Sequence, residues 1–296
     1  MQYSITRDFR GSTFSPPSVR ARVMMVPFAT DANNVEVVLE LGENQHHAWG
    51  VKELLKAGVE VTVVRREHEK IERFGQDLRL PDTSDYDLIY SNHNLLIRTP
   101  TERLLGLRKT PLISLVYSGE PLWLPQMHYG VMCMTPHAHR RFKASATQAM
   151  YAPWGIDPES RLHEPVESTG DHFVTTGVTE RDFDVMFNAA RIAGEPLILA
   201  ARGQAFENAP ANVKVIKDMV GPWEIRDLYA GAAGGLVILK RDDKMRLAVG
   251  WTNILELLAV GVPVIKTRTG CLDEIVDIEE IGAGFLVEPG DVQGLV

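Results

Sequence analysis

Residues 248–276 read AVGWTNILELLAVGVPVIKTRTGCLDEIV, which predicts a loop, a helix, a strand and a second, short helix. The loop ends in Gly250, and we expect the side chain of Thr252 or Asn253 to cap the helix that follows. Gly261 ends the helical pattern, and the β-branched run after it predicts a buried strand. A helix that leads directly into such a strand is one unit of the alternating pattern of a parallel sheet.

The start of this helix is a candidate anion site. Four backbone amides at a helix start have no partner within the helix, and the helix dipole adds partial positive charge there, which suits a diphosphate. Glu256 lies one turn further along, where its carboxylate can accept two hydrogen bonds from a ribose diol. The residues alone leave a second interpretation open, namely an ordinary capped helix with an exposed glutamate.

Strands alternate with helices on both sides of this stretch. The second half of the chain has predicted strands at 173–177, 196–203, 212–218, 235–240, 263–269 and 284–291, and helices at 181–194, 222–232, 252–261 and 273–278. The first half has predicted strands at 35–41, 59–64, 86–92, 110–118 and 130–135, and helices at 49–58, within 95–109 and from 137 to about 149. This order predicts an α/β protein with a parallel sheet, covered on both faces, in each half.

Two Rossmann-like domains with a cleft between them account for the pattern, and 296 residues suffice for two domains. We assign residues 1–34 to an N-terminal extension, 35–159 to the first domain, 160–172 to a linker and 173–296 to the second domain. The extension is rich in Pro, Gly, Ser and Thr, although VMMVPF at 23–28 could add a strand. Ligands of such sheets bind beyond the carboxyl ends of the strands, so the loops there are candidate sites.

The composition fits a globular protein, with 45% hydrophobic and 24% charged residues. A net charge of −8 argues against a nucleic-acid partner, and two cysteines are too few for a disulfide framework or a cysteine-based zinc site. No apolar run reaches the roughly 18 residues of a transmembrane helix, and the N-terminus lacks the apolar region of a signal peptide. We therefore expect a cytoplasmic protein, in which the basic segments 98–109 and 137–145 could contact anionic lipid peripherally.

The decisive stretch resembles the nucleotide-sugar site of GT-B glycosyltransferases, in particular retaining family 4. Members of that family carry a segment like G-x-T-x-L-E-A-x-A-x-G-x-P-V-I before T-x-x-G-x-x-E. The matching residues of this chain are Gly250, Thr252, Leu255, Glu256, Ala259, Gly261, Pro263, Val264, Ile265, Thr267, Gly270 and Glu274. TGVTERDFDVMFNAA at 176–190 and FLVEPGD at 285–291 also match, and the similarity covers most of residues 35–291.

The resemblance implies a transferase that moves a sugar from a UDP- or GDP-sugar to an acceptor hydroxyl, with retention and without a metal or cofactor. Arg181 would neutralise charge on the leaving diphosphate, and Glu256 would hold the ribose; these are the catalytic candidates. For Arg181 an ion pair with Asp182 or Asp184 is the alternative. The donor site would consist of Gly177, Arg181, Arg202, Val220, Gly221, Gly250, Trp251, Thr252 and Glu256, with backbone amides on the diphosphate and backbone groups near Val220 on the nucleobase.

The resemblance assigns the acceptor side of the cleft to the first half of the chain. The loop 42–48 resembles the family's loop after the first strand, where a glycine lets the backbone approach a phosphate or sugar. Trp123 and Trp154 could stack on sugar faces or be buried in the protein. The acceptor candidates are Gly42, Asn44, Gln45, His46, His93 and Glu120.

Several departures from the family keep a second function open. Ala248 stands where members often carry a glutamate, and Val178 follows Gly177 where many carry an arginine. The histidine expected after the fourth strand is not evident in VYSGE at 116–120, and the chain stops where the family continues with helices, as a fragment would. The alternatives are a catalytically inactive nucleotide- or sugar-binding module of the same fold, a nucleotide-sugar epimerase, or a phosphorylase.

Overall fold

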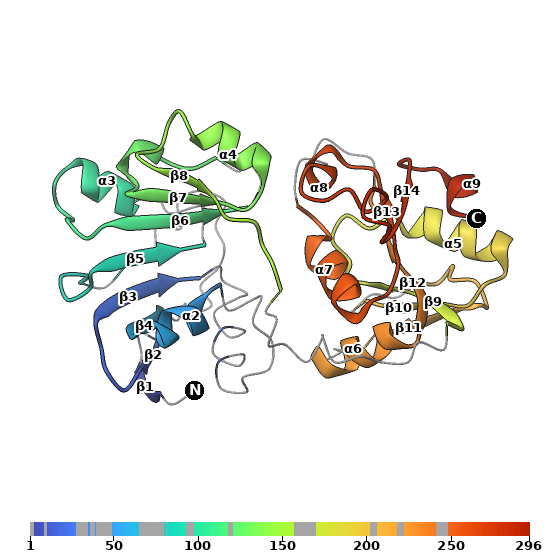
Figure 1. Ribbon diagram of the computed structural model, residues 1–296, viewed down its shortest axis with the longest axis horizontal. Helices are drawn as coiled ribbons and strands as arrows, with labels where there is room; N and C mark the ends of the chain where they lie inside the picture. The colour runs from blue at the N-terminus through green and yellow to red at the C-terminus, as the bar shows by residue number, and fades with distance from the viewer. Residues whose placement is uncertain are drawn as a thin grey trace. The chain divides into compact units, whose positions relative to one another are not determined.

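The computed structural model describes residues 3–8, 11–27, 35, 39, 49–64, 80, 82–92, 98–117, 121–156, 170–201, 206–217, 222–240 and 248–296. The chain folds as two compact units, Met1–Trp154 and Gly155–Val296. Each unit has a sheet with helices packed on it (Figure 1).

The described strands of the first unit form one sheet in the order β1-β2-β4-β3-β5-β6-β7-β8. The pairs β1–β2 and β2–β4 are antiparallel, and all other neighbours are parallel. The strands are β1 (Ser4–Asp8), β2 (Gly11–Ser15), β3 (Ala21–Val26), β4 (Val59–Val64), β5 (Leu88–Ser91), β6 (Leu112–Val116), β7 (Gly130–Cys133) and β8 (Ala149–Tyr151). The helices are α2 (Val51–Lys56), α3 (Arg98–Leu104), the 3-10 helix η2 (Pro125–Met127) and α4 (Pro136–Phe142). The parallel part has the order of a doubly wound flavodoxin-like sheet, with its switch point between β3 and β5.

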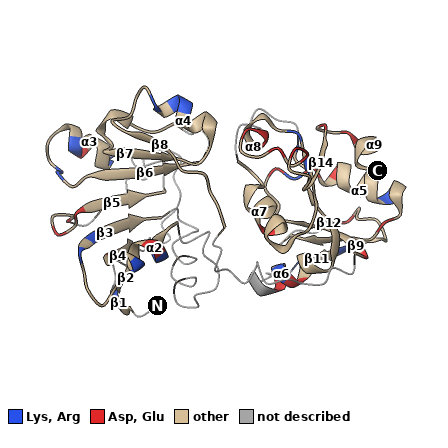
Figure 2. Cartoon of the chain, viewed as in Figure 1, with Lys and Arg blue, Asp and Glu red and all other residues tan. Residues whose placement is uncertain are grey.

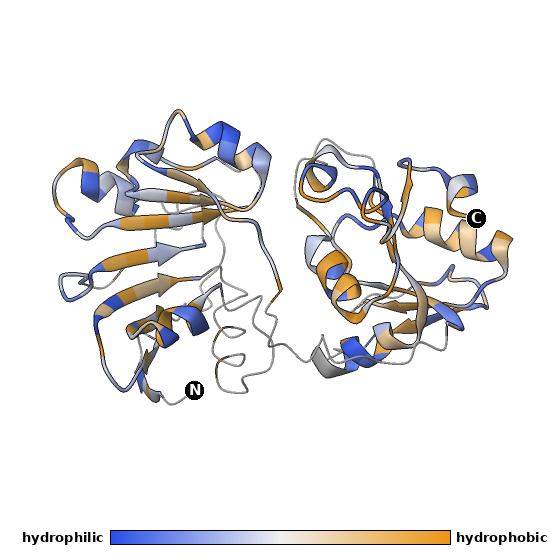
Figure 3. Cartoon of the chain, viewed as in Figure 1, coloured by the Kyte–Doolittle hydropathy of each residue, from blue (hydrophilic) through white to orange (hydrophobic). Residues whose placement is uncertain are grey.

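Apolar side chains of the central strands form the core of this unit. Met24 and Met25 on β3 and Val61 on β4 are fully buried, because a central strand of a parallel sheet is covered on both faces. Val51 and Leu55, four residues apart on α2, bury the inner face of that helix. Figure 3 shows apolar residues along the strands β3, β5 and β6 and on the helix α2.

The N-terminal residues are not the irregular extension that the sequence predicts. Residues 4–26 supply three strands of the sheet, and β3 pairs in parallel with both β4 and β5, which makes it the first parallel strand of the unit. The predicted strand at 35–41 is wrong as well, since its two described residues, Val35 and Leu39, are buried with helical backbone. A short β-branched run has the same periodicity as the buried face of a helix, so periodicity alone does not separate the two.

Two elements near the end of the unit also differ from the prediction. The basic helix α4 is shorter than the predicted 137–149, with its N-terminus capped by the Thr135 hydroxyl, which accepts from the Ala138 amide at 3.1 Å. Residues 149–151 form the strand β8, which the sequence analysis does not predict. Figure 2 shows basic residues on α4.

The second unit has an all-parallel sheet of described strands in the order β11-β10-β9-β12-β13-β14. In chain order this is 3-2-1-4-5-6, the order of dinucleotide-binding Rossmann folds. The strands are β9 (His172–Thr176), β10 (Leu197–Ala200), β11 (Val213–Ile216), β12 (Ala232–Val237), β13 (Val264–Thr267) and β14 (Gly284–Val287). The helices are α5 (Phe183–Ala193), α6 (Pro222–Ala230), α7 (Trp251–Val260), α8 (Gly270–Asp273) and α9 (Val292–Leu295). Each strand predicted for this half is present.

The helix starts show where local prediction holds and where it fails. Asp182 caps α5 by accepting from the Val185 amide at 3.1 Å. The predicted side-chain cap of α7 is wrong: its N-cap is Gly250, with φ 85° and no side-chain hydrogen bond, so Thr252 and Asn253 lie within the first turn. The short helix α8 begins three residues before the predicted position 273. The first turn of α7 therefore offers its side chains for contacts other than capping.

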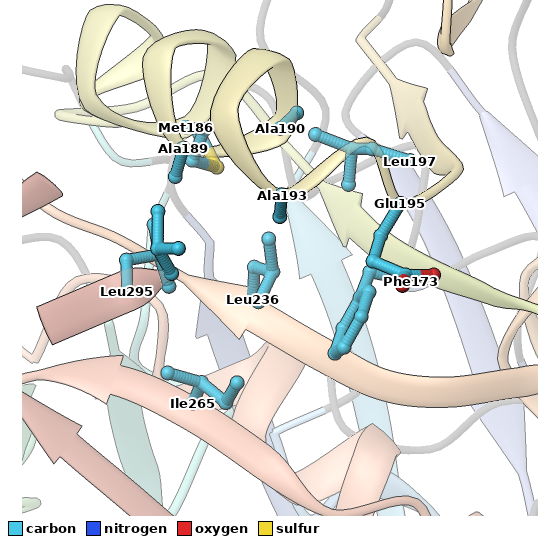
Figure 4. Close-up of a pocket in the computed structure, with 11 residues that line it drawn as sticks. Phe173, Met186, Ala189, Ala190, Ala193, Glu195, Leu197, Leu236, Ile265 and Leu295 are labelled. Atoms are coloured by element: carbon cyan, nitrogen blue, oxygen red, sulfur yellow. The ribbon is translucent and has the colours of Figure 1, made fainter. Parts of the chain in front are cut away.

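Helix α5 packs over the sheet of the second unit and leaves a small apolar cavity of about 110 Å³ beneath it. Met186 from α5, Leu236 from β12, Ile265 from β13 and Leu295 from α9 point into it (Figure 4). Because its lining is apolar apart from Glu195 at its edge, this cavity belongs to the hydrophobic core and not to a polar ligand site.

Candidate functional site

The strand order of the second unit reverses between β9 and β12, and the polar groups of interest gather at the carboxyl ends of these two strands. The loops after them are tied together, since the Asp182 amide donates to the Ile238 carbonyl and the Lys240 amide to the Glu180 carbonyl, both at 2.9 Å. The N-terminus of α7 lies at the same place, because Gly250 faces both Val237 at the end of β12 and Arg181. In open α/β sheets this switch point is where ligands bind.

Two glycines in left-handed backbone conformation flank Arg181. Gly177 follows β9 with φ 79°, and Gly250 precedes α7 with φ 85°. A β-carbon on Gly250 would lie 2.6 Å from Val237 Cγ1 and 3.4 Å from an Arg181 nitrogen, and one on Gly177 would lie 3.6 Å from the other Nη nitrogen. The guanidinium therefore lies against two tight turns whose conformation and space both favour glycine.

Arg181 is a buried cation, with 3% of its surface exposed. Its Nη1 donates to the Thr179 carbonyl at 3.1 Å, its Nη2 donates to Asn253 Oδ1 at 2.5 Å, and its Nε has no hydrogen-bond partner. Burial lowers the pKa of the guanidinium to about 10, which still leaves it charged at neutral pH. Both acceptors are neutral, so the positive charge is solvated only in part.

No carboxylate in the described part of the chain forms an ion pair with Arg181, so the predicted alternative of an ion pair with Asp182 or Asp184 is wrong. Asp182 instead caps α5. A buried cation beside the positive end of a helix dipole is unfavourable without an anion nearby. This arrangement therefore favours an anionic ligand in contact with the guanidinium.

The first turn of α7 adds hydrogen-bond donors to this site. The Trp251 amide donates to the Ala248 carbonyl at 3.2 Å and the Ile254 amide to the Gly250 carbonyl at 3.0 Å. Within the described residues, the amides of Thr252 and Asn253 have no acceptor. A buried guanidinium and two unengaged amides are the groups that bind phosphate oxygens at helix starts.

Glu256 is buried, with 6% of its surface exposed, so the interpretation as an exposed glutamate on an ordinary capped helix is wrong. The phenol of Tyr229 on α6 donates to Glu256 Oε2 at 3.1 Å and lies 2.5 Å from the Thr176 hydroxyl. The Asn253 side-chain amide donates to Thr176 Oγ1 at 2.7 Å. Burial, followed by the charge of Glu256, raises the pKa of Tyr229 well above its usual value, so the phenol keeps its proton.

The sequence did not identify Thr176, Tyr229 or Asn253 as site residues. Two signals in the sequence are consistent with such a role: Thr176 is the last residue of β9, immediately before Gly177, and Asn253 lies three residues before Glu256 on the same face of α7. For Tyr229 the sequence holds no comparable signal, because helix α6 is brought to the site only by the fold.

Many predicted site residues lie outside the described part of the chain. They are Arg202, Val220 and Gly221 of the donor set and Gly42, Asn44, Gln45, His46, His93 and Glu120 of the acceptor set. The segment 42–48 does not directly follow the first parallel strand, as the resemblance implied, because that strand is β3 and the segment after it begins at Pro27.

The two tryptophans considered for sugar stacking occupy different environments in the first unit. Trp154 packs on Trp49 and Tyr117, with ring centroids 4.8 Å and 5.5 Å away, so it is part of an aromatic cluster. Trp123 is half exposed, and its indole donates to the Thr101 hydroxyl at 3.1 Å.

The described residues contain no group of three or more His, Cys, Asp or Glu side chains placed to hold a metal ion. Among the described helices, none is long and apolar enough to cross a membrane.

No protein-family model matches the sequence, and no curated protein matches it. Solved structures do. AviGT4, a glycosyltransferase involved in avilamycin A biosynthesis, is 17% identical with a TM-score of 0.54, and the match covers 91% of this chain and 84% of that one. The α,α-trehalose 6-phosphate synthase of Burkholderia multivorans is 12% identical with a TM-score of 0.58 and coverages of 94% and 87%.

A third match is the UDP-forming α,α-trehalose-phosphate synthase of Burkholderia xenovorans in complex with glucose-6-phosphate. It is 12% identical with a TM-score of 0.57, and the match covers 93% of this chain and 90% of that one. These identities are low, but the matches span both Rossmann-like units. The chain therefore has the GT-B fold, with two Rossmann-like units in one polypeptide, in common with these proteins.

Proposed function

We propose that the protein is a glycosyltransferase that moves a sugar from a nucleoside-diphosphate donor to an acceptor hydroxyl with retention of configuration. The observation that carries this proposal is the buried Arg181, which has only neutral partners and lies beside the unengaged amides of α7 at the switch point of a Rossmann sheet. A diphosphate supplies the negative charge that this place lacks. Similar structures include a glycosyltransferase and a UDP-forming synthase, and this supports a UDP-sugar as the first donor to test.

In this proposal Arg181 and the α7 amides hold the two phosphates, and Glu256 accepts hydrogen bonds from the ribose hydroxyls. Glu256 lies one turn beyond the α7 start, and Tyr229 fixes its carboxylate through Oε2. Gly177 and Gly250 let the backbone lie close to the guanidinium, because a β-carbon at either position would contact it. The nucleobase would meet backbone groups near Val220 and Gly221, with Arg202 as a second cation.

The proposed reaction is a front-side displacement that needs no metal or cofactor. The bond from the anomeric carbon to the phosphate oxygen breaks while the acceptor oxygen bonds to the same face of that carbon. The departing diphosphate takes the acceptor proton, and negative charge grows on its oxygens. In this proposal the Arg181 guanidinium and the α7 amides contact those oxygens, and they stabilise the transition state more than the ground state because the charge there is larger.

A second candidate is a binding module of the same fold that no longer transfers sugar. Ala248, where a glutamate is usual in the resembled family, supports it. Turnover of the donor separates the two functions. An epimerase would convert the donor sugar without any acceptor, which separates it from a transferase.

The test is release of nucleoside diphosphate from UDP-glucose and GDP-mannose, with the anomer of the released sugar followed by NMR. We expect slow release with retention, lost in Arg181→Met and kept in Arg191→Met, which removes an exposed arginine on α5. Binding without release would support the module and contradict the transferase. Release with inversion would contradict the proposed mechanism.

A further inference from the structure

A continuous series of hydrogen bonds joins Arg181 to Glu256 through three neutral side chains. The guanidinium donates to Asn253 Oδ1, Asn253 Nδ2 donates to Thr176 Oγ1, Thr176 and Tyr229 share a hydrogen bond, and Tyr229 donates to Glu256. These residues come from the loop after β9, from β9 itself, from α6 and from α7. The series connects the candidate phosphate-binding cation to the candidate ribose-binding carboxylate.

The donors and acceptors in this series fit only one direction. The single phenolic proton of Tyr229 is used on Glu256, so Tyr229 accepts in its hydrogen bond with Thr176. The Thr176 proton is therefore used on Tyr229, and its oxygen accepts from Asn253 Nδ2. With Nδ2 directed at Thr176, the side-chain oxygen of Asn253 must face Arg181.

The orientation of the Asn253 amide thus depends on a hydroxyl that does not touch Arg181. Thr176 is 6% exposed and Tyr229 is 1% exposed, so water does not readily replace either group. If the Thr176 hydroxyl were absent, the NH₂ group of Asn253 would lose its 2.7 Å hydrogen bond and keep only the long one to the Tyr229 phenol, at 3.4 Å. The Asn253 amide could then rotate and turn its NH₂ group toward the Arg181 guanidinium. Both groups are hydrogen-bond donors with positive charge on their hydrogens, so they repel each other.

We propose that Thr176 and Tyr229 are positioning residues that hold the Arg181 guanidinium, through Asn253, in the place where it meets the donor phosphates. The identity of the anion rests on the proposed function, but the positioning itself concerns the ligand-free protein. Neither residue contacts the anion in this proposal. The effect of Thr176 is confined to the phosphate end of the site, whereas Tyr229 also holds Glu256 at the nucleoside end.

The matched variants are Thr176→Val, which has nearly the shape of threonine but no hydroxyl, and Thr176→Ser, which keeps the hydroxyl. Tyr229→Phe breaks the series at the next step, so the proposal stays testable if Thr176→Val does not fold. Circular dichroism and thermal melting establish folding of each variant before any comparison.

The first readout is the ¹⁵N NMR spectrum of the arginine side chains without ligand, in which Arg181→Met assigns the Arg181 signals. A held guanidinium gives separate signals for its two Nη groups, and a freely rotating one gives an averaged signal. We expect separate signals in the protein itself and in Thr176→Ser, and an averaged signal in Thr176→Val and Tyr229→Phe. Separate signals in both hydroxyl-free variants would overturn the proposal.

The second readout is calorimetric titration with UDP and with uridine. We expect Thr176→Val to weaken UDP binding about five- to tenfold, as for loss of one hydrogen bond, and uridine binding by less than twofold. Thr176→Ser should restore UDP binding, and equal losses for both ligands would overturn the proposal. If the protein bound no nucleoside diphosphate while the NMR signals changed as expected, the proposed function would fail and the positioning role would stand.

Discussion

The substitution Arg181→Met tests whether the buried guanidinium serves a ligand or the fold. Burial lowers the pKa of Arg181 from its usual value to about 10, which corresponds to about 3 kcal/mol against the charged form at 1.36 kcal/mol per pH unit. Because the pKa is lower in the folded than in the unfolded state, the folded protein carries this cost at all pH values below about 10. The cost disappears only as pH rises above about 10 toward the usual pKa of arginine.

Methionine keeps much of the length of arginine and removes the charge. The variant loses two hydrogen bonds from the guanidinium, to Thr179 and Asn253, worth about 1.5 kcal/mol each at the low end for charged donors. The relief of about 3 kcal/mol and the loss of about 3 kcal/mol nearly cancel. We therefore expect the free energy of unfolding to change by no more than about 1 kcal/mol, whereas removing one partner of a buried ion pair costs about 3–5 kcal/mol.

Urea unfolding with and without pyrophosphate measures both effects. At 100 times its Kd, pyrophosphate should stabilise the unsubstituted protein by about 2.7 kcal/mol and leave Arg181→Met unchanged. Arg191→Met, on the exposed face of α5, is the control and should behave like the unsubstituted protein. A loss of more than about 3 kcal/mol in Arg181→Met, with stabilisation by pyrophosphate retained, would refute the reasoning and make Arg181 a structural residue.

Three further outcomes are expected. Glu256→Gln should weaken binding of nucleoside and nucleoside diphosphate alike by about 1.5–3 kcal/mol in calorimetry, and unchanged uridine affinity would rule out a ribose contact. In urea titrations, Gly250→Ala should lower the free energy of unfolding by at least about 2 kcal/mol more than Gly290→Ala does. Both glycines have φ near 80°, but only the β-carbon at position 250 would lie 2.6 Å from Val237. Equal losses in the two variants would contradict this explanation. Burial lowers the pKa of His128 to about 4, so as the pH falls from 6.5 the unfolded chain protonates this histidine before the folded protein does. The free energy of unfolding should therefore fall by about 3 kcal/mol between pH 6.5 and 4. Urea midpoints that fall as steeply in His128→Gln would exclude this histidine as the cause.

The sequence predicted the second unit well because its strands are short apolar runs separated by clear helix signals. Gly194 and Gly261 end helices in left-handed conformation, as their positions in the pattern suggested. The first unit was harder to predict. Its first parallel strand lies among Pro, Gly, Ser and Thr residues that indicate loops, and the buried residues Val35 and Leu39 belong to a run whose β-branched composition favours a strand.

The candidate site was predictable only where one local motif contains it. Gly250 and Glu256 lie in one continuous stretch, and Arg181 lies in a second matching segment. Thr176, Tyr229 and Asn253 meet through contacts between residues 24 to 77 positions apart, and no local pattern encodes such contacts. Burial of Glu256 likewise follows from the packing of α6 beside α7 and not from the spacing of the motif.

The most direct test of the central claim is calorimetric titration of the protein with UDP, GDP, ADP and TDP, each beside its nucleoside. We predict micromolar binding of one diphosphate and binding of its nucleoside at least tenfold weaker, because Arg181 and the α7 amides act on the phosphates alone. Arg181→Met should bring the two affinities together. Equal affinity for nucleoside and diphosphate, or no binding of any of the four diphosphates, would contradict a nucleoside-diphosphate site at the start of α7.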